Sequence, residues 1–307
     1  MSLAVKFLSL DFDNPLIMPS GILQEVAAHY QAEEHGLGGV TTKSMTMEPR
    51  EGNPMPRVIK YDHGILNSVG LRNPGIKTGI GEWAKFIKVT KIPVIASVFA
   101  VNVADFVYLA TQVETIHPAM IELNLSCPNT TNELGQPLGM GVESTLAAVK
   151  AVRKVLKPGT KLLAKLSPNV NNIGEVAKAA ESAGADAISA INTVGPGMVI
   201  DIRRQKPMLG NIVGGVSGPG IRPVAVRCVW DIYNSVKIPI LGMGGVETAR
   251  DAIEMMLAGA SLVGVGSAWY RHGFGVYNQI KAELETYIKE NKLKSLAKLV
   301  GGAHDRH

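Results

Sequence analysis

The segment ELNLSCPNT, residues 122–130, places a cysteine and a proline directly after an alternating apolar run. The chain has 2 cysteines, and this one, Cys127, lies between Asn124 and Asn129. A buried cysteine usually behaves as a small hydrophobic residue, whereas a thiol on an exposed turn among amides suits a chemical role. Such a thiol could accept a proton, because an electropositive setting lowers its pKa from about 8.5 toward neutrality. From this segment alone both interpretations are open.

Polar and glycine residues close the carboxyl ends of the predicted strands. Any one of them could be a turn residue or a helix cap. In a barrel of parallel strands, however, these ends meet at one mouth, where they would form a single site. The residues are Ser20, Gly21, Lys43, Ser44, Ser97, Asn124, Cys127, Lys165, Asn192, Thr193, Gly244, Gly245, Gly266 and Ser267.

The glycines and lysines of this set suit a phosphate ester. The turns in ILGMGGV and VGVGSAW follow the last two predicted strands, where barrels commonly bind phosphate through backbone N–H groups. Tight turns without a ligand are the alternative. Lys43 and Lys165 interrupt apolar strands, and a buried lysine needs an anion. A structural salt bridge could supply the anion, and so could a phosphate-bearing cofactor whose ring gains negative charge.

Together these features indicate flavin mononucleotide (FMN). Its one phosphate fits the glycine turns, and a lysine beside N1 and the C2 carbonyl would stabilise its reduced, anionic ring. Asn67, Asn124, Asn129 and Asn192 offer both donors and acceptors, which suits a planar ring of alternating N–H and C=O groups. A pyrimidine-like substrate stacked on the flavin is consistent with these amides.

Short β-branched runs alternate with amphipathic segments along the 307 residues. Segments such as VESTLAAVKAVRKVL repeat apolar residues with the helical period. Eight such units predict an α/β fold, a single (β/α)8 TIM barrel over residues 1–307. The alternative is an open dinucleotide-binding sheet, but the first strand lacks its G-x-G-x-x-G turn. The predicted strands are 15–21, 38–44, 93–99, 120–126, 161–167, 185–193, 238–245 and 261–267.

Two insertions, 46–76 and 194–223, are rich in glycine and proline and longer than ordinary connections. Both follow strands directly, so we expect inserted loops over the C-terminal mouth of the barrel. Surface loops without a role in the site are the alternative.

Composition disfavours several classes of protein. No run approaches the roughly 20 apolar residues of a membrane span, and the N-terminus does not resemble an export signal, so we expect a cytoplasmic protein. The net charge of +5 is spread along the chain, which disfavours nucleic-acid binding. The 2 cysteines show no metal-ligand spacing, so we predict no metal site and no iron–sulfur cluster bound by this chain alone. Cys228, in the helical pattern RPVAVRCVWDIYNSV, is expected to be packed.

Over nearly the whole chain, motifs resemble the class 1 dihydroorotate dehydrogenases of pyrimidine biosynthesis. They are NPLIMPSG, TTKSMTMEPREGNP, GILNSVGLRNPG, IELNLSCPNT, AKLSPN, INTVGPGMVID, GGVSGPGIRP, LGMGGV and VGVGSA. The resemblance implies an FMN-dependent barrel that oxidises dihydroorotate to orotate. Cys127 would be the base that removes the C5 proton while hydride leaves C6 for flavin N5. The loop after Pro128, NTTNELGQPLGMG, has the composition of a lid over the site.

The resemblance also assigns binding residues. Those around the substrate would be Lys43, Asn67, Val69, Gly70, Leu71, Asn124, Asn129, Asn192 and Thr193. Those around the flavin would be Ser20, Gly21, Lys43, Ser44, Ser97, Asn124, Lys165, Ile191, Gly218, Gly244, Gly245, Gly266 and Ser267. Relatives often carry an asparagine near Ser97, so its flavin contact is the least defined of these.

A cysteine base distinguishes these class 1 motifs from the membrane-associated class 2 dihydroorotate dehydrogenases, which use serine as the base. NSVG and INTVGPGM resemble the NAD-linked B subtype more than the fumarate-using A subtype. The B subtype implies a heterotetramer with a partner subunit that carries FAD and an iron–sulfur cluster and passes electrons to NAD. Three alternatives are an A-type enzyme, a dihydropyrimidine dehydrogenase-like flavoprotein, and a non-catalytic barrel that binds a phosphate ligand.

Overall fold

Eight parallel strands close into a barrel in the order β10-β15-β16-β3-β4-β7-β8-β9. The structure, a computed structural model, describes residues 2–126 and 138–304. Each strand predicted from the sequence overlaps one barrel strand, so the prediction of a TIM barrel is confirmed. The barrel strands are β3 (Leu16–Met18), β4 (Gly39–Thr41), β7 (Val94–Val98), β8 (Met120–Asn124), β9 (Leu162–Leu166), β10 (Ala187–Ala190), β15 (Ile240–Met243) and β16 (Ala260–Gly264).

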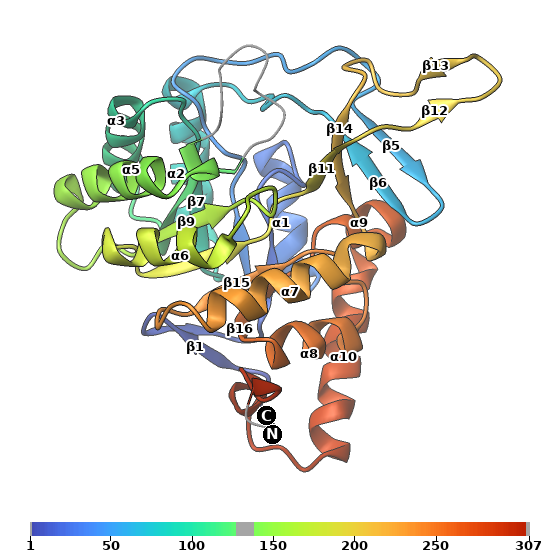
Figure 1. The fold of residues 1–307 in the computed structure, drawn as a ribbon. Helices are drawn as coiled ribbons and strands as arrows, with labels where there is room; N and C mark the ends of the chain where they lie inside the picture. The colour runs from blue at the N-terminus through green and yellow to red at the C-terminus, as the bar shows by residue number, and fades with distance from the viewer. Residues whose placement is uncertain (1, 127–137, 305–307) are drawn as a thin grey trace.

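Helices surround the barrel and bury their apolar faces against it (Figure 1). Their starts follow from local sequence: the Asn102 side chain accepts from Asp105 N at the start of α3, and Thr248 and Asp251 form a capping box at the start of α8. The strands are therefore covered on both sides, which explains their continuous apolar character. The helices are α1 (Val26–Glu34), α2 (Ile76–Val89), α3 (Val103–Glu114), α5 (Val142–Val155), α6 (Ile173–Ser182), α7 (Arg222–Tyr233), α8 (Ala249–Leu257), α9 (Ser267–His272) and α10 (Gly275–Glu290).

The two insertions form one antiparallel sheet in the order β11-β14-β6-β5, which we call the roof sheet. The first insertion supplies β5 (Val58–Tyr61) and β6 (Gly64–Asn67), and the second supplies β11 (Val194–Gly197) and β14 (Gly214–Ser217). A small hairpin of β12 (Ile200–Asp201) and β13 (Lys206–Pro207) extends from it (Figure 1). The roof sheet contributes residues to the cavity at the carboxyl ends of the barrel strands, so the predicted position of the insertions is confirmed.

The N-terminal hairpin of β1 (Val5–Phe7) and β2 (Leu10–Phe12) lies at the other end of the barrel from the roof sheet (Figure 1). Three short 3-10 helices complete the described chain, at Leu138–Met140, Pro219–Ile221 and Leu296–Leu299. No helix in the described ranges combines the length and the apolar character needed to cross a bilayer.

Candidate active site

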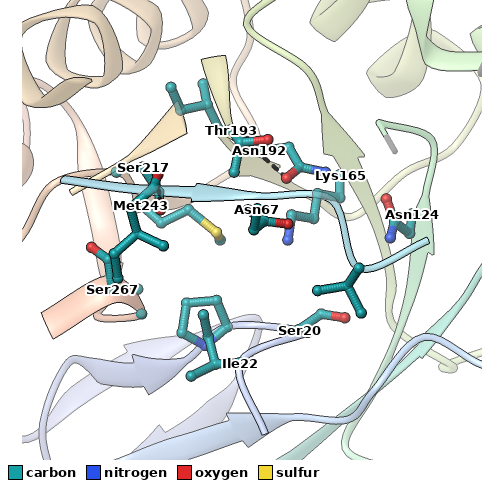
Figure 2. A pocket seen from close by; sticks show the side chains of 18 of the residues that line it. Ser20, Ile22, Asn67, Asn124, Lys165, Asn192, Thr193, Ser217, Met243 and Ser267 are labelled. Atoms are coloured by element: carbon teal, nitrogen blue, oxygen red, sulfur yellow. Dashed lines mark hydrogen bonds between the residues drawn. The ribbon is translucent and has the colours of Figure 1, made fainter. Parts of the chain in front are cut away.

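A cavity of about 1120 Å³, open solvent at its mouth included, lies between the barrel strand ends and the roof sheet. The barrel side is formed by residues at the ends of the strands and directly after them, and the roof side includes Val58, Ile65, Asn67 and Ser217. The sticks in Figure 2 come from both sides and point into the same space. Residues far apart in the sequence therefore share one site, as the barrel topology requires.

Buried charge is concentrated at the floor of this cavity. Lys43 and Lys165 are 6% and 4% exposed and line the cavity, and Glu122 of β8 is 1% exposed beneath it. Lys165 points into the cavity (Figure 2), and the described residues form no ion pair with it. Lys165 thus places a buried ammonium group at the cavity without a carboxylate partner among the described residues. A buried charge of this kind favours an anionic ligand.

Asparagine side chains on β8 and after β10 are held in fixed orientations. Asn124 Nδ2 donates to Ser44 Oγ at 3.0 Å, and Asn124 Oδ1 accepts from the backbone N and the hydroxyl of Ser126. Asn192 Nδ2 donates to the carbonyl and hydroxyl oxygens of Ser126, each at 3.0 Å, while its Oδ1 accepts from Thr193 N (Figure 2). Thr193 Oγ1 is buried and has no hydrogen-bond partner among the described residues. A polar ligand could complete the hydrogen bonds of these fixed amides and of the unpartnered hydroxyl.

Glycines after β15 allow this turn to pack closely against α7. Gly244 and Gly245 have φ angles of +135° and +76°, and a Cβ atom at these positions would lie 2.6 Å from the Ala225 Cβ and 2.7 Å from the Arg222 Cβ. The Arg222 guanidinium is bound to Asp251 and, at 3.0 Å, to Glu254. It is thus engaged by carboxylates, so backbone N–H groups remain the chief donors for an anion at this turn.

The structure describes only one of the two cysteines, Cys228. Cys127, Asn129 and most of the predicted lid fall within residues 127–137, outside the described residues, and their roles stay predictions. Cys228 packs within α7, as predicted, and burial raises the pKa of its thiol to about 11. A thiol with such a pKa is protonated near neutral pH and is not a base for catalysis.

Sequence comparisons agree with the geometry. A model of the dihydroorotate dehydrogenase family matches residues 2–288. The chain is 40% identical over 306 residues to the catalytic subunit of dihydroorotate dehydrogenase B (NAD(+)) from Thermococcus kodakarensis, with 97% of each chain covered. The subunits of the same name from Pyrococcus furiosus and Desulforamulus reducens are each 41% identical, with 98% and 99% of each chain covered. The chain belongs to the dihydroorotate dehydrogenase family. The family predicted from the motifs is confirmed.

Most of the residues that the family resemblance assigns do meet at the cavity. Among the described residues two do not line it: Ser97, which is buried and bonds to Glu122, and Gly218, which lies next to Gly245. The assigned residues on the cavity wall are Ser20, Gly21, Lys43, Ser44, Asn67, Val69, Gly70, Leu71, Asn124, Lys165, Ile191, Asn192, Thr193, Gly244, Gly245, Gly266 and Ser267. Their roles in binding are taken up below as proposals.

Further wall residues of this dihydroorotate dehydrogenase were missed because they are mostly apolar and carry no chemical signature. Tyr270 of α9 donates its hydroxyl to the Ile22 carbonyl oxygen at 3.2 Å, and burial raises the pKa of the phenol. Pro19, Ile22 and Met243 are adjacent to assigned residues and Gly264 lies two positions before Gly266, a signal that could have identified them. The remaining missed residues are Val58, Ile65, Ser217 and Ile221.

Proposed function

We propose that this chain, acting as one unit over residues 1–307, oxidises (S)-dihydroorotate to orotate for pyrimidine nucleotide (UMP) synthesis, with one FMN as its cofactor. The observation that carries the proposal is the buried ammonium group of Lys165, which points into the cavity and forms no ion pair with the described residues, in a chain of this family. FMN, when bound, supplies at N5 the acceptor for the hydride that leaves C6. A ligand that carries a phosphate and a ring able to become anionic would balance that charge.

Three features of the cavity fit FMN. The glycine turn at Gly244 and Gly245, with Gly266 and Ser267, would hold the phosphate through the backbone. Lys165 would neutralise the ring at N1 and the C2 carbonyl. Gly21 has a φ of +86°, a backbone conformation that favours glycine at the floor of the cavity. Ser20, Ser44, Ile191 and Asn124 complete the proposed flavin contacts, with Ser97 and Gly218 acting from behind the cavity wall.

The proposed substrate site lies on the asparagine side of the cavity. Asn67, Asn124 and Asn192 line it and present amide groups to the substrate ring, together with Lys43, Val69, Gly70, Leu71 and Thr193. Asn129 joins them by its position in the motif. Cys127 is the proposed base: its thiolate accepts the C5 proton, and no other described or assigned residue is given that role. The cysteine follows Ser126, which bonds to both Asn124 and Asn192.

The electron acceptor of the proposed enzyme is NAD, reached through a partner subunit that carries FAD and an iron–sulfur cluster in a heterotetramer. The relatives named above are catalytic subunits of NAD(+)-linked enzymes, which supports this proposal.

The proposal is tested by purifying the chain and adding dihydroorotate without oxygen. We expect a yellow protein whose flavin band bleaches rapidly and whose product is orotate. The subtypes are distinguished by assaying NAD, fumarate and quinone as electron acceptors, each with and without co-purifying proteins. A dihydropyrimidine dehydrogenase is distinguished by testing uracil in place of orotate as the ligand. A colourless chain that binds no FMN would instead support a non-catalytic barrel.

A further inference from the structure

A chain of hydroxyl groups connects the cavity to a carboxylate that does not line it. Glu122 Oε1 accepts from Ser97 Oγ at 3.0 Å, and Glu122 Oε2 accepts from Ser189 Oγ at 2.7 Å. Ser97 Oγ lies 2.9 Å from Ser44 Oγ, which lies 2.9 Å from Ser20 Oγ. Ser20 and Ser44 line the cavity, whereas Glu122, Ser97 and Ser189 lie beneath it.

The carboxylate sets the direction of every hydrogen bond in this chain. A hydroxyl has one proton to donate, and Ser97 donates its proton to Glu122. Ser97 can therefore only accept from Ser44, and Ser44, its proton used, can only accept from Ser20. The direction of donation runs from the cavity down to Glu122.

This direction also fixes the side-chain amide of Asn124. Because Ser44 Oγ has no proton left, the group of Asn124 that lies 3.0 Å from it must be a donor, the Nδ2 amide. Asn124 Oδ1 is then directed to Ser126, which donates to it from its backbone N at 3.3 Å and its hydroxyl at 3.0 Å. The second N–H of Nδ2 is left for the cavity, which Asn124 lines. The chain from Glu122, two residues earlier on the same strand, and the Ser126 backbone N–H thus both favour the orientation in which Asn124 offers the ligand a donor.

We propose that Glu122 is a positioning residue that acts through Ser97 and Ser44 to hold Asn124 as a hydrogen-bond donor toward an oxygen of the bound pyrimidine. The inference rests on the proposed function. Without an acceptor at position 122, Ser97 can donate to Ser44, and Ser44 can turn its own proton toward Asn124. One of the two contacts that hold the Asn124 amide is then weakened, while the contact from the Ser126 backbone N–H remains.

The test is the affinity of FMN-loaded protein for orotate, measured by calorimetry. We expect Ser97→Ala and Glu122→Leu each to weaken binding about tenfold, the effect of one hydrogen bond to a charged ligand. The double variant should bind no more weakly than the weaker single variant, because both changes break one chain. Glu122→Gln should restore binding to within about threefold, since its amide oxygen still accepts from Ser97.

Ser189→Ala is the matched control. It removes the same hydroxyl from the same carboxylate, but Ser189 is not on the path to Asn124, so orotate affinity should stay within about twofold. Orotate binding by Ser97→Ala as tight as by Ser189→Ala would overturn the inference, and so would losses that multiply in the double variant. If Glu122→Leu does not fold, the two serine variants still decide. If the wild-type chain binds FMN and orotate and Ser97→Ala binds orotate equally tightly, only the positioning role is refuted. If the wild-type chain binds neither FMN nor orotate, the proposed function is refuted as well.

Discussion

Asn67 and Gly215 are register partners across β6 and β14, and Asn67 Nδ2 donates to the Gly215 carbonyl oxygen at 3.4 Å. The two residues are 148 positions apart. Their pairing joins the two insertions in the roof sheet and brings Gly215 against the Thr193 side chain, leaving no room for a Cβ atom. The roof sheet thereby positions Thr193, whose hydroxyl has no partner in the described structure.

Replacing Gly215 with Ala should therefore displace Thr193 and weaken orotate binding by about tenfold, with FMN retained. Calorimetry with orotate and the flavin absorbance of the purified protein measure the two effects separately. Gly81→Ala is the control, because a Cβ atom there meets nothing within 4 Å. Unchanged orotate affinity in the Gly215 variant would show that Thr193 does not contact the ligand.

Lys165→Met should reduce FMN affinity by roughly 10- to 100-fold, since a hydrogen bond to a charged group contributes about 1.5–3 kcal/mol. Methionine keeps the length of the side chain and removes the charge. The variant should also have a lower flavin reduction potential, because the reduced, anionic ring loses its cation. FMN fluorescence during dialysis and anaerobic redox titration are the measurements. Lys178→Met, on the exposed face of α6, should match wild type in both.

Gly245→Ala should abolish FMN retention while the barrel still folds. The added Cβ atom would lie 2.7 Å from the Arg222 Cβ and 2.9 Å from the Gly218 carbonyl oxygen, at a φ of +76° that alanine adopts poorly. Flavin content per chain and circular dichroism separate the two effects. A variant that keeps a full complement of FMN would argue against phosphate binding at this turn.

The stability of the protein should fall between pH 6.5 and pH 4 because of His29. Burial lowers the pKa of His29 from 6.5 to about 4, and its ring packs edge-on against Trp83 at 4.7 Å. As the pH falls, the unfolded chain binds the proton before the folded chain does, so the free energy of unfolding falls by roughly 3 kcal/mol across this interval. Urea unfolding at pH 7.5 and pH 4.5 measures the loss. His29→Phe should lose less on acidification, whereas His63→Gln, at an exposed position, should behave as wild type.

Thiol labelling of the native protein should modify Cys127 and spare Cys228. The pKa of about 11 at Cys228 leaves almost no thiolate near neutral pH, and α7 buries the side chain. Peptide mapping after treatment with iodoacetamide, with and without orotate, identifies the modified position. We expect orotate to protect Cys127, and urea to expose Cys228. Equal labelling of Cys127 in both conditions would remove the support for a base beside the substrate.

Much of the barrel and of its mouth could be predicted from the sequence. Because the strands are buried on both sides, each appears in the sequence as a short apolar run. Polar residues such as Lys43, Lys165 and Asn124 are conspicuous at the ends of these runs. The roof sheet could not be predicted, because the pairing of β6 with β14 depends on long-range register that glycine-rich loops do not encode in a periodic pattern. The bond from Ser97 to Glu122 was missed for a related reason: it crosses neighbouring strands inside the barrel.

The roof sheet has a further consequence for the order in which the enzyme matures on the ribosome. Synthesis proceeds at about 5–20 residues per second, so β14 emerges roughly 7–30 s after β6. During that interval the edge of β6 that will pair with β14 has free N–H and C=O groups and can pair with another nascent chain. The last strand of the sheet thus completes the binding site and also covers an aggregation-prone edge, so the translation rate between residues 67 and 214 bears on how much protein reaches the active form.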